Sequence, residues 1–283
     1  MTQITIKPLK DTESMRRVEA LQTEIWGMPD LDVVPSHQLL AAAGAGGAVL
    51  GAFEPGGTMV GFCYGFAGWR EGRPLFYSHM AGVRGAYQLQ DVGFRLKCAQ
   101  REAALAMGFD HAVWTYDPLQ SVNARFNLHK LGATAKRYYI DYYGEMPDAL
   151  NRGLDSDRLE VDWVLRSQRV QEAISRSASA RDWEEAPYAL EGRPHPLGVA
   201  PGEPNLALGA PVVLLEVPTD FAALRQRGLH LAQAWRAATR AALVHYFRRG
   251  YRAVDFLLRP SRPHGGAASL RGDYVLVQDG NED

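Results

Sequence analysis

His79 is the first residue of this sequence whose type and position suggest chemistry. It lies in the middle of a predicted strand, residues 74–83, nine residues before Gln88. An unperturbed imidazole has a pKa of about 6.5, so near neutral pH it can accept a proton from a reacting group. We therefore predict that His79 is a general base. The alternative is a core histidine that is hydrogen-bonded across the sheet, and the sequence leaves both open.

The segment after His79 has the layout of an anion-binding site. A predicted strand ends at Val83, a loop follows, and a helix begins near Val92. The first backbone N–H groups of a helix have no partner within it, and the helix dipole favours a negative charge there, so a phosphate can bind. The residues of this segment that matter below are Val83, Gln88, Leu89, Gln90, Asp91, Val92 and Gly93. The alternative is a plain loop in which Asp91 caps the helix.

Further polar candidates follow the next predicted strand, residues 112–116. Trp114 and Asp117 lie at its end and in the loop after it, where ligands of open sheets commonly bind. A core tryptophan and a turn-forming aspartate are the alternatives. Asn123 and Asn127 are four apart, hence on one face of a short helix. Solvent-facing or capping asparagines are the alternative.

Two groups of arginines complete the candidates. Arg152 and Arg158 lie in a polar cluster before a late strand, and a guanidinium fork suits the carboxylate of a substrate. A structural pair of Asp157 with Arg158 is the alternative. In the C-terminal region we predict a structural ion-pair network, with a clamp for a substrate carboxylate as the alternative. Its members are Arg236, Arg240 and Asp255.

The elements that must position these residues follow from hydrophobic periodicity and from turn residues. Asp11 or Thr12 is expected to cap the first helix, and Gly27 to end it. The order is strand, two helices, three strands, helix, strand, helix, strand, and the class is therefore α+β, or mixed-sheet α/β. The strands are expected at 4–9, 48–53, 59–66, 74–83, 112–116 and 159–165, and the helices at 12–26, 35–44, 92–107 and 123–131.

The C-terminal region is predicted to repeat part of this order. A strand is expected at 212–217, a long helix at 222–249, and strands at 253–258 and 274–277. The stretch before them is rich in Pro and Gly and is typical of a linker. We predict a domain at 1–166, a linker at 167–210 and a smaller, partial copy of the first fold at 211–283.

Composition excludes several classes of protein. The 31 basic and 32 acidic residues nearly balance, so neither nucleic acid nor an anionic membrane is an expected partner. No stretch approaches the ~20 apolar residues that span a bilayer. The two cysteines form no disulfide framework, and no histidines are paired at metal-ligand spacing, so no metal site is predicted. The expected compartment is the cytosol, and a homodimer is left open.

The segment around the loop resembles motif A of the GNAT superfamily of acyl-CoA N-acyltransferases. That motif reads Gln/Arg-x-x-Gly-x-Gly/Ala after a strand that ends in an apolar residue, and here Gln88–Gly93 follows Val83. The tracts SHMAGV, AQREAAL, WTYDPLQ and KLGA, in this order, resemble a group of bacterial predicted GNAT acyltransferases over about residues 20–165. The C-terminal tracts AWRAATR and YFRRGYRAVDF resemble the tail of that group.

The resemblance implies a GNAT fold with a second, smaller GNAT-like half. It also implies acetyl-CoA or another acyl-CoA as co-substrate, and transfer of the acyl group to a primary amine of a small molecule or amino acid. The loop would hold the pyrophosphate, Asn123 and Asn127 would flank the pantetheine arm, and His79 would take the proton of the amine. The backbone N–H groups of the strand that ends at Val83 would polarise the thioester carbonyl.

The sequence departs from the family pattern at three positions. Asp91 stands where GNAT loops normally carry glycine, and Leu89 where a small residue is frequent. Leu128 replaces the tyrosine that protonates the leaving thiolate in many of these enzymes; Tyr116 and Tyr143 are the candidate substitutes. These departures leave a second hypothesis open, a catalytically weakened or inactive GNAT-fold protein that binds a ligand.

Overall fold

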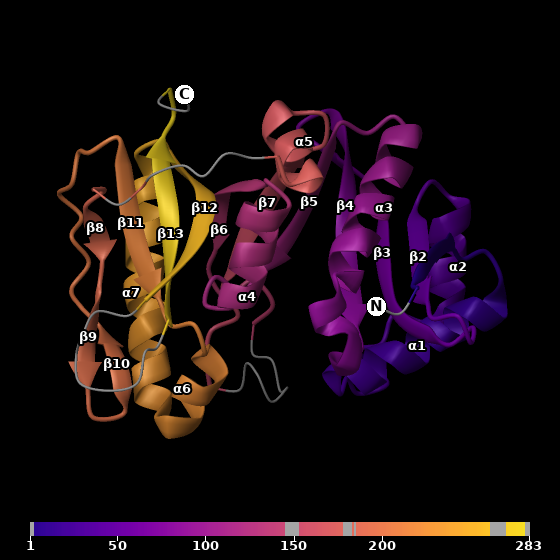
Figure 1. Cartoon of the computed structure of the whole chain (residues 1–283), viewed down its shortest axis with the longest axis horizontal. Coiled ribbons are helices and arrows are strands. Elements are labelled where there is room, and N and C mark those ends of the chain that lie inside the picture. Colours follow the sequence, from indigo (N-terminus) through magenta and orange to yellow (C-terminus); the bar gives the residue numbers. More distant parts are fainter. Residues whose placement is uncertain (1–2, 145–152, 178–182, 184, 261–269, 281–283) are drawn as a thin grey trace. The chain divides into compact units, whose positions relative to one another are not determined.

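The computed structural model describes residues 3–144, 153–177, 183, 185–260 and 270–280, which fall into two compact units. The first unit comprises residues 1–114 with 164–167, and the second comprises 115–163 with 168–283. Each unit contains a mixed sheet with helices packed on it (Figure 1), so the predicted fold class is confirmed. The division into domains at 1–166 and 211–283 stays a prediction.

The sheet of the first unit follows the hydrophobic pattern of its strands. Its strand order is β1-β2-β3-β4-β5. The pairing is antiparallel from β1 to β4 and parallel between β4 and β5. The strands are β1 (Thr5–Pro8), β2 (Ala48–Phe53), β3 (Met59–Arg70), β4 (Arg73–Val83) and β5 (His111–Tyr116).

Helices cover both faces of this sheet because alternate strand residues point to opposite sides. On one face Val49, Phe62 and Tyr64 pack with α1 (Thr12–Trp26) and α2 (Ser36–Gly44). On the other face Leu50 and Cys63 pack with α3 (Val92–Ala106). The core of the unit is therefore two apolar layers, one on each side of the sheet.

The caps of α1 match the sequence prediction. The Asp11 side chain accepts a hydrogen bond from the backbone N–H of Ser14 at 2.8 Å, as an N-cap does. Gly27 ends the helix with φ of 65°, a left-handed conformation that glycine adopts without steric cost. A short 3₁₀ helix, η1 (Gly85–Gln90), precedes α3 and was not predicted.

The second unit has the strand order β7-β6-β12-β13-β11-β8, with one parallel pair, β11 with β8. The prediction missed β6 (Thr134–Tyr139) and the three strands between 188 and 201, where a linker was expected. The strands are β6, β7 (Arg158–Val164), β8 (Tyr188–Leu190), β9 (Gly192–His195), β10 (Gly198–Pro201), β11 (Val212–Val217), β12 (Tyr251–Pro260) and β13 (Leu270–Gln278).

Helices of the second unit include the long C-terminal helix that was expected at 222–249. It is divided at Gly228 into α6 (Phe221–Arg227) and α7 (Leu229–Arg248), and α7 buries Leu231, Trp235 and Ala242. The other helices are α4 (Ser121–Ala124), a π-helix η2 (Arg125–Lys130) and α5 (Gln168–Ser175). Gly132 follows η2 with φ of 67°, so the predicted glycine stop is confirmed.

Candidate active site

The pairing between β4 and β5 is the first feature of the candidate site. In the described chain β5 pairs with β4 only at Phe76↔Ala112 and Tyr77↔Val113, although β4 continues to Val83. From Ser78 onward, β4 therefore has hydrogen bonds to β3 on one edge and no pairing with β5 on the other. Backbone groups on such an edge can bond an extended ligand that carries amides.

The loop after β4 folds back on the end of the strand. The Gln88 side-chain amide donates a hydrogen bond to the carbonyl oxygen of Val83 at 3.2 Å, and Gln90 donates to Ala86 at 3.1 Å. Leu89 is fully exposed, whereas Val92 is fully buried and anchors the first turn of α3. The loop thus leads the chain to the N-terminus of a 15-residue helix, where the first N–H groups point away from the helix.

Asp91 occupies the turn between the loop and α3 in a left-handed conformation, with φ of 57° and ψ of 14°. This conformation costs about 1–2 kcal/mol for a residue with a side chain, and it has no such cost for glycine. The Asp91 side chain stands at the N-cap position but makes no capping hydrogen bond to α3. The alternative interpretation of Asp91 as a capping side chain is therefore wrong, and the backbone conformation is the one that a glycine would favour.

His79 lies on the face of β4 that packs with α1 and α2, where it is partly covered and keeps access to solvent. Three aromatic rings surround it: the ring centroids of Tyr64, Phe66 and Tyr77 lie 5.7, 6.0 and 6.2 Å from that of the imidazole. Partial burial among these rings lowers the pKa of His79 from its usual value. Because burial disfavours the charged form, the imidazole is neutral at neutral pH and able to accept a proton.

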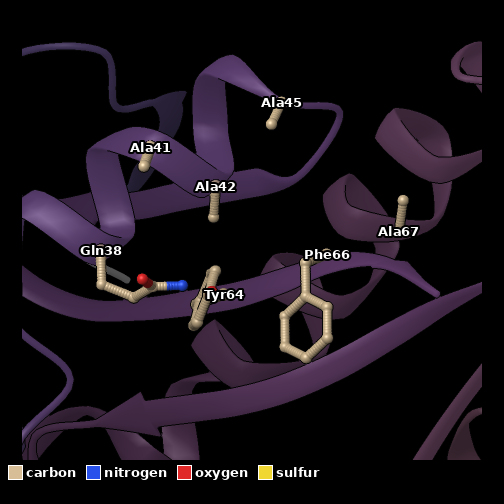
Figure 2. Close-up of a pocket in the computed structure, with 7 residues that line it drawn as sticks. All are labelled: Gln38, Ala41, Ala42, Ala45, Tyr64, Phe66 and Ala67. Carbon is tan, nitrogen blue, oxygen red and sulfur yellow. The ribbon is translucent and has the colours of Figure 1, made fainter.

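A pocket of about 310 Å³ opens beside these rings (Figure 2). It lies between α2 and β3, and Tyr64 and Phe66 belong both to its wall and to the surroundings of His79. Figure 2 shows the Gln38 amide directed toward Tyr64, with the alanines of α2 across from the two rings. The full lining is Gln38, Ala41, Ala42, Ala45, Tyr64, Phe66 and Ala67.

A buried lysine lies on the opposite face of β4 and was missed by the sequence prediction. Lys97, which is 3% exposed, donates hydrogen bonds to Ser78 Oγ at 2.8 Å and Gln100 Oε1 at 2.9 Å. Its Nζ lies 3.6 Å from the ring centroid of Trp114, so this predicted ligand residue packs against Lys97 in the core. Burial lowers the pKa of Lys97 to about 7.

The signal that could have revealed this lysine is the polar face of α3. Lys97, Gln100 and Arg101 are spaced three and four apart and are all buried, beside the apolar positions from which the helix was predicted. Polar residues at helical spacing next to an apolar stripe usually face solvent. Their burial depends on Ser78, Trp114 and other distant partners that no local pattern contains.

In the second unit, Asp117 and Arg158 have structural partners. Arg236 donates two hydrogen bonds to the Asp117 carboxylate, at 2.6 and 2.7 Å. The Arg158 guanidinium carbon lies 5.0 Å from the Tyr143 ring centroid, and Arg158 is buried. Arg152 lies outside the described residues. As substrate contacts, Asp117 and Arg158 stay predictions.

The predicted ion-pair network of the second unit exists with different partners. Arg240 binds Asp157 at 2.7 Å and Asp155 at 2.5 Å, and Arg236 binds Asp117. Asp255 was expected to join them, but it contacts His129 at 2.9 Å instead. The aspartates lie on the segment before β7 and the loop after β5, which the sequence pattern did not connect with α7.

The two asparagines of the short helix differ in environment. Asn123 is exposed on α4, whereas Asn127 is 4% exposed on η2. Tyr116, one candidate for the acid that protonates the leaving group, is buried, and its hydroxyl lies 3.2 Å from the Tyr274 hydroxyl. Burial raises the pKa of Tyr116. Asn123 and Asn127 belong to the second unit and the loop at 85–91 to the first, and their joint role stays a prediction.

The described residues contain neither a candidate metal site nor a membrane-spanning helix. No group of three or more His, Cys, Asp or Glu side chains in the described ranges could hold a metal ion. No helix in the same ranges is long and apolar enough to cross a membrane.

Comparisons with known proteins find no matching family model and no matching curated protein. Among solved structures, a protein from Desulfovibrio desulfuricans assigned to the GNAT family of acetyltransferases is 12% identical. It covers 58% of this chain and 99% of its own, with a TM-score of 0.47. Salmonella typhimurium yncA, solved with acetyl-CoA, is 19% identical, covers 64% and 99%, and has a TM-score of 0.46.

An aminoglycoside acetyltransferase from an uncultured soil metagenomic sample, solved with trehalose, is also 19% identical. It covers 44% of this chain and 84% of its own, with a TM-score of 0.39. With TM-scores below 0.5 and identities below 20%, these similarities do not establish a family for this chain.

Proposed function

We propose that this chain is an acyl-CoA-dependent N-acyltransferase of the GNAT type, which transfers an acetyl or related acyl group to a primary amine of a small molecule. The observation that carries the proposal is that β4 is not paired with β5 after Tyr77. His79 lies on this unpaired segment, and a pocket lies beside the aromatic rings that contact it. An extended thioester substrate, a base and a space for the acceptor are the three requirements of direct acyl transfer.

The residues of the loop and of α3 fit a CoA pyrophosphate except at one position. Val92 and Gly93 begin α3, and a Cβ built at Gly93 would meet only Val83, at 3.8 Å, so the backbone there is open to a ligand. The exposed Leu89 points away from the core and obstructs no buried space. The Asp91 carboxylate is the exception, because it places a negative charge at the end of the helix where phosphate would bind.

The edge of β4 would hold the rest of the co-substrate. Backbone N–H groups between Ser78 and Val83 that are not bonded to β3 would bond the amides of an extended arm and polarise the acyl carbonyl. Acyl-CoA supplies the electrophilic acyl carbon. The protein supplies the strand edge that orients the acyl carbon and the base that activates the amine.

His79 would remove the proton of the acceptor. An amine reaches the site as an ammonium, and it must lose one proton before its nitrogen can attack the acyl carbon. The imidazole is neutral because its pKa is lowered by burial, so it can take that proton. Leu128 cannot donate a proton to the leaving thiolate. The nitrogen of the adduct loses a second proton as the C–S bond breaks and the amide forms, and this proton goes to the departing thiolate through water.

Titration and turnover together test the proposal. Calorimetric titration with acetyl-CoA and desulfo-CoA measures binding, and release of the CoA thiol in the presence of primary amines measures turnover. Binding with turnover supports the enzyme. Binding without turnover for any amine supports the second candidate, a GNAT-fold ligand-binding protein, which the Asp91 carboxylate at the helix N-terminus favours. No binding contradicts both.

We expect Asp91→Gly to bind CoA more tightly than the wild type. Two like charges about 4 Å apart repel by about 1 kcal/mol in water and by about 4 kcal/mol at an effective dielectric constant of about 20. Removing the carboxylate should therefore raise the affinity for CoA about tenfold or more. Glycine also relieves the left-handed strain at φ of 57°. Calorimetry on both proteins measures the change in Kd.

Asp91→Asn is the matched control, because asparagine tolerates the left-handed conformation and carries no charge. An affinity gain in both variants assigns the effect to charge, and a gain in Asp91→Gly alone assigns it to the backbone. If neither variant binds more tightly, this loop does not hold the pyrophosphate.

A further inference from the structure

The pocket beside His79 has an unusual lining for a site that receives an amine. Four of its seven lining residues are alanines, two are aromatic, and one is the uncharged Gln38. Gln38 is hydrogen-bonded to the Tyr64 hydroxyl. None of the seven lining residues carries a charged side chain. A second charge on a ligand would therefore enter the pocket without an opposite charge in its lining, which is unfavourable.

The pocket and the imidazole share two walls. Tyr64 and Phe66 line the pocket, and their rings lie 5.7 and 6.0 Å from the ring of His79. A ligand whose nitrogen lies at His79 can therefore place its other atoms over these rings. Aromatic faces attract an ammonium before it loses its proton, and they pack well against aryl or alkyl groups afterwards.

The size of the pocket limits the ligand further. A volume of about 310 Å³ lies at the lower end of the range for small-molecule sites. The alanines of α2 make this space, since a larger side chain at Ala41 or Ala42 would occupy it. The site is thus suited to a ligand with a small, apolar body.

We propose that the acceptor is a monoamine with a compact, uncharged aryl or alkyl body, which lies in the α2–β3 pocket with its nitrogen at His79. This inference rests on the proposed function and adds the substrate class. It excludes polycationic amines and free amino acids as good acceptors, since each brings a second charge to an uncharged wall.

Two matched pairs of ligands test this substrate class. Phenethylamine is compared with phenylalanine, which adds a carboxylate, and pentylamine with 1,5-diaminopentane, which adds an ammonium. With saturating acetyl-CoA, we expect kcat/KM to be about 100-fold higher for the singly charged member of each pair. Equal or better turnover of the doubly charged members would overturn the substrate class and leave the proposed acyltransferase intact.

Direct binding keeps the two proposals separable. Calorimetric titration of the same four amines, without CoA, reports occupancy of the pocket whether or not acyl transfer occurs. Tighter binding of the monoamines without turnover upholds the pocket assignment and contradicts the enzyme. If the charged partners bind as tightly as the monoamines, the pocket does not select by charge, and the inference fails.

A variant of the pocket should change this selectivity in a defined direction. Gln38→Glu places a carboxylate in the wall, and we expect the ratio of kcat/KM for diaminopentane over pentylamine to rise about tenfold. Gln38→Met has a similar size without charge and should keep the wild-type ratio. Gln38 is exposed on α2, so neither change should prevent folding, and thermal melting checks this. An unchanged ratio in Gln38→Glu would place the second amine outside the pocket.

Discussion

Replacing Lys97 by methionine is expected to stabilise the protein by about 1 kcal/mol at pH 6. The difference between the usual pKa of 10.5 and the value of about 7 in the folded chain corresponds to about 5 kcal/mol of unfavourable burial of the charged form. Methionine has a similar shape and carries no charge. About 1 kcal/mol is lost for each of the hydrogen bonds to Ser78 and Gln100, and about 2 kcal/mol for the contact of the ammonium with the Trp114 ring. Ser78 and Gln100 remain bonded to each other at 2.7 Å.

The difference in stability between Lys97→Met and the wild type should decrease as the pH rises. Below pH 7 Lys97 is protonated in both states, and the folded chain carries the full cost of the buried ammonium. Between about pH 7 and 10.5 the unfolded chain binds the extra proton, so the stability of the wild type rises with pH. Above 10.5 both states are neutral, and the advantage of methionine disappears.

Urea unfolding of both proteins at pH 6 and pH 9 measures this difference, with tryptophan fluorescence as the signal because Trp114 lies beneath Lys97. Lys10→Met, at an exposed lysine of the same unit, is the control and should show no such pH dependence. A Lys97→Met protein that is less stable than the wild type at pH 6 would show that the contacts of the ammonium outweigh its burial.

His79→Ala is expected to lower kcat/KM for amine acylation by about 10²–10⁴ near neutral pH, the usual cost of losing a general base. The loss should shrink as the pH approaches the pKa of the free amine, because the amine then needs no base. In the wild type the activity should persist to a pH below the usual 6.5, since burial among the aromatic rings lowers the pKa of His79.

Added imidazole distinguishes loss of a base from loss of structure. Because the His79 side chain is exposed, a free imidazole can reach its place and should restore part of the rate of His79→Ala. His111→Ala, at another exposed histidine of the same unit, should keep the wild-type profile. A His79→Ala enzyme with an unchanged rate and pH profile would leave water as the proton acceptor.

Helix ends and strands could be predicted from the sequence where their cause lies in neighbouring residues. Asp11 and Gly27 bound the first helix because a cap and a left-handed glycine act on neighbouring residues. The strand at Ala48–Phe53 was predicted with its observed bounds. By contrast, β6 was missed because its charged residues hide the alternation, and β8 forms by pairing with β11, more than twenty residues away.

The residues of the candidate site could be proposed from the sequence, but their surroundings could not. His79 and the loop at Gln88–Gly93 were located from spacing and resemblance. The aromatic ring contacts of His79 come from β3 as well as β4, and the pocket depends on alanines of α2 that look like ordinary helix formers. The left-handed Asp91 could not be foreseen, because the sequence shows an N-cap residue type and the backbone conformation is set by the loop.

The free edge of β4 is also pre-organised. β4 is paired with β3 along nearly its whole length, up to Gly61↔Val83, with one register shift between Tyr64 and Gly65 of β3, so its backbone is held in place by β3. A ligand that adds along this edge must order itself but needs no folding of the strand, and the entropy cost of association falls largely on the ligand. Changes that loosen the β3–β4 hairpin should therefore weaken binding at the edge without touching any contact atom.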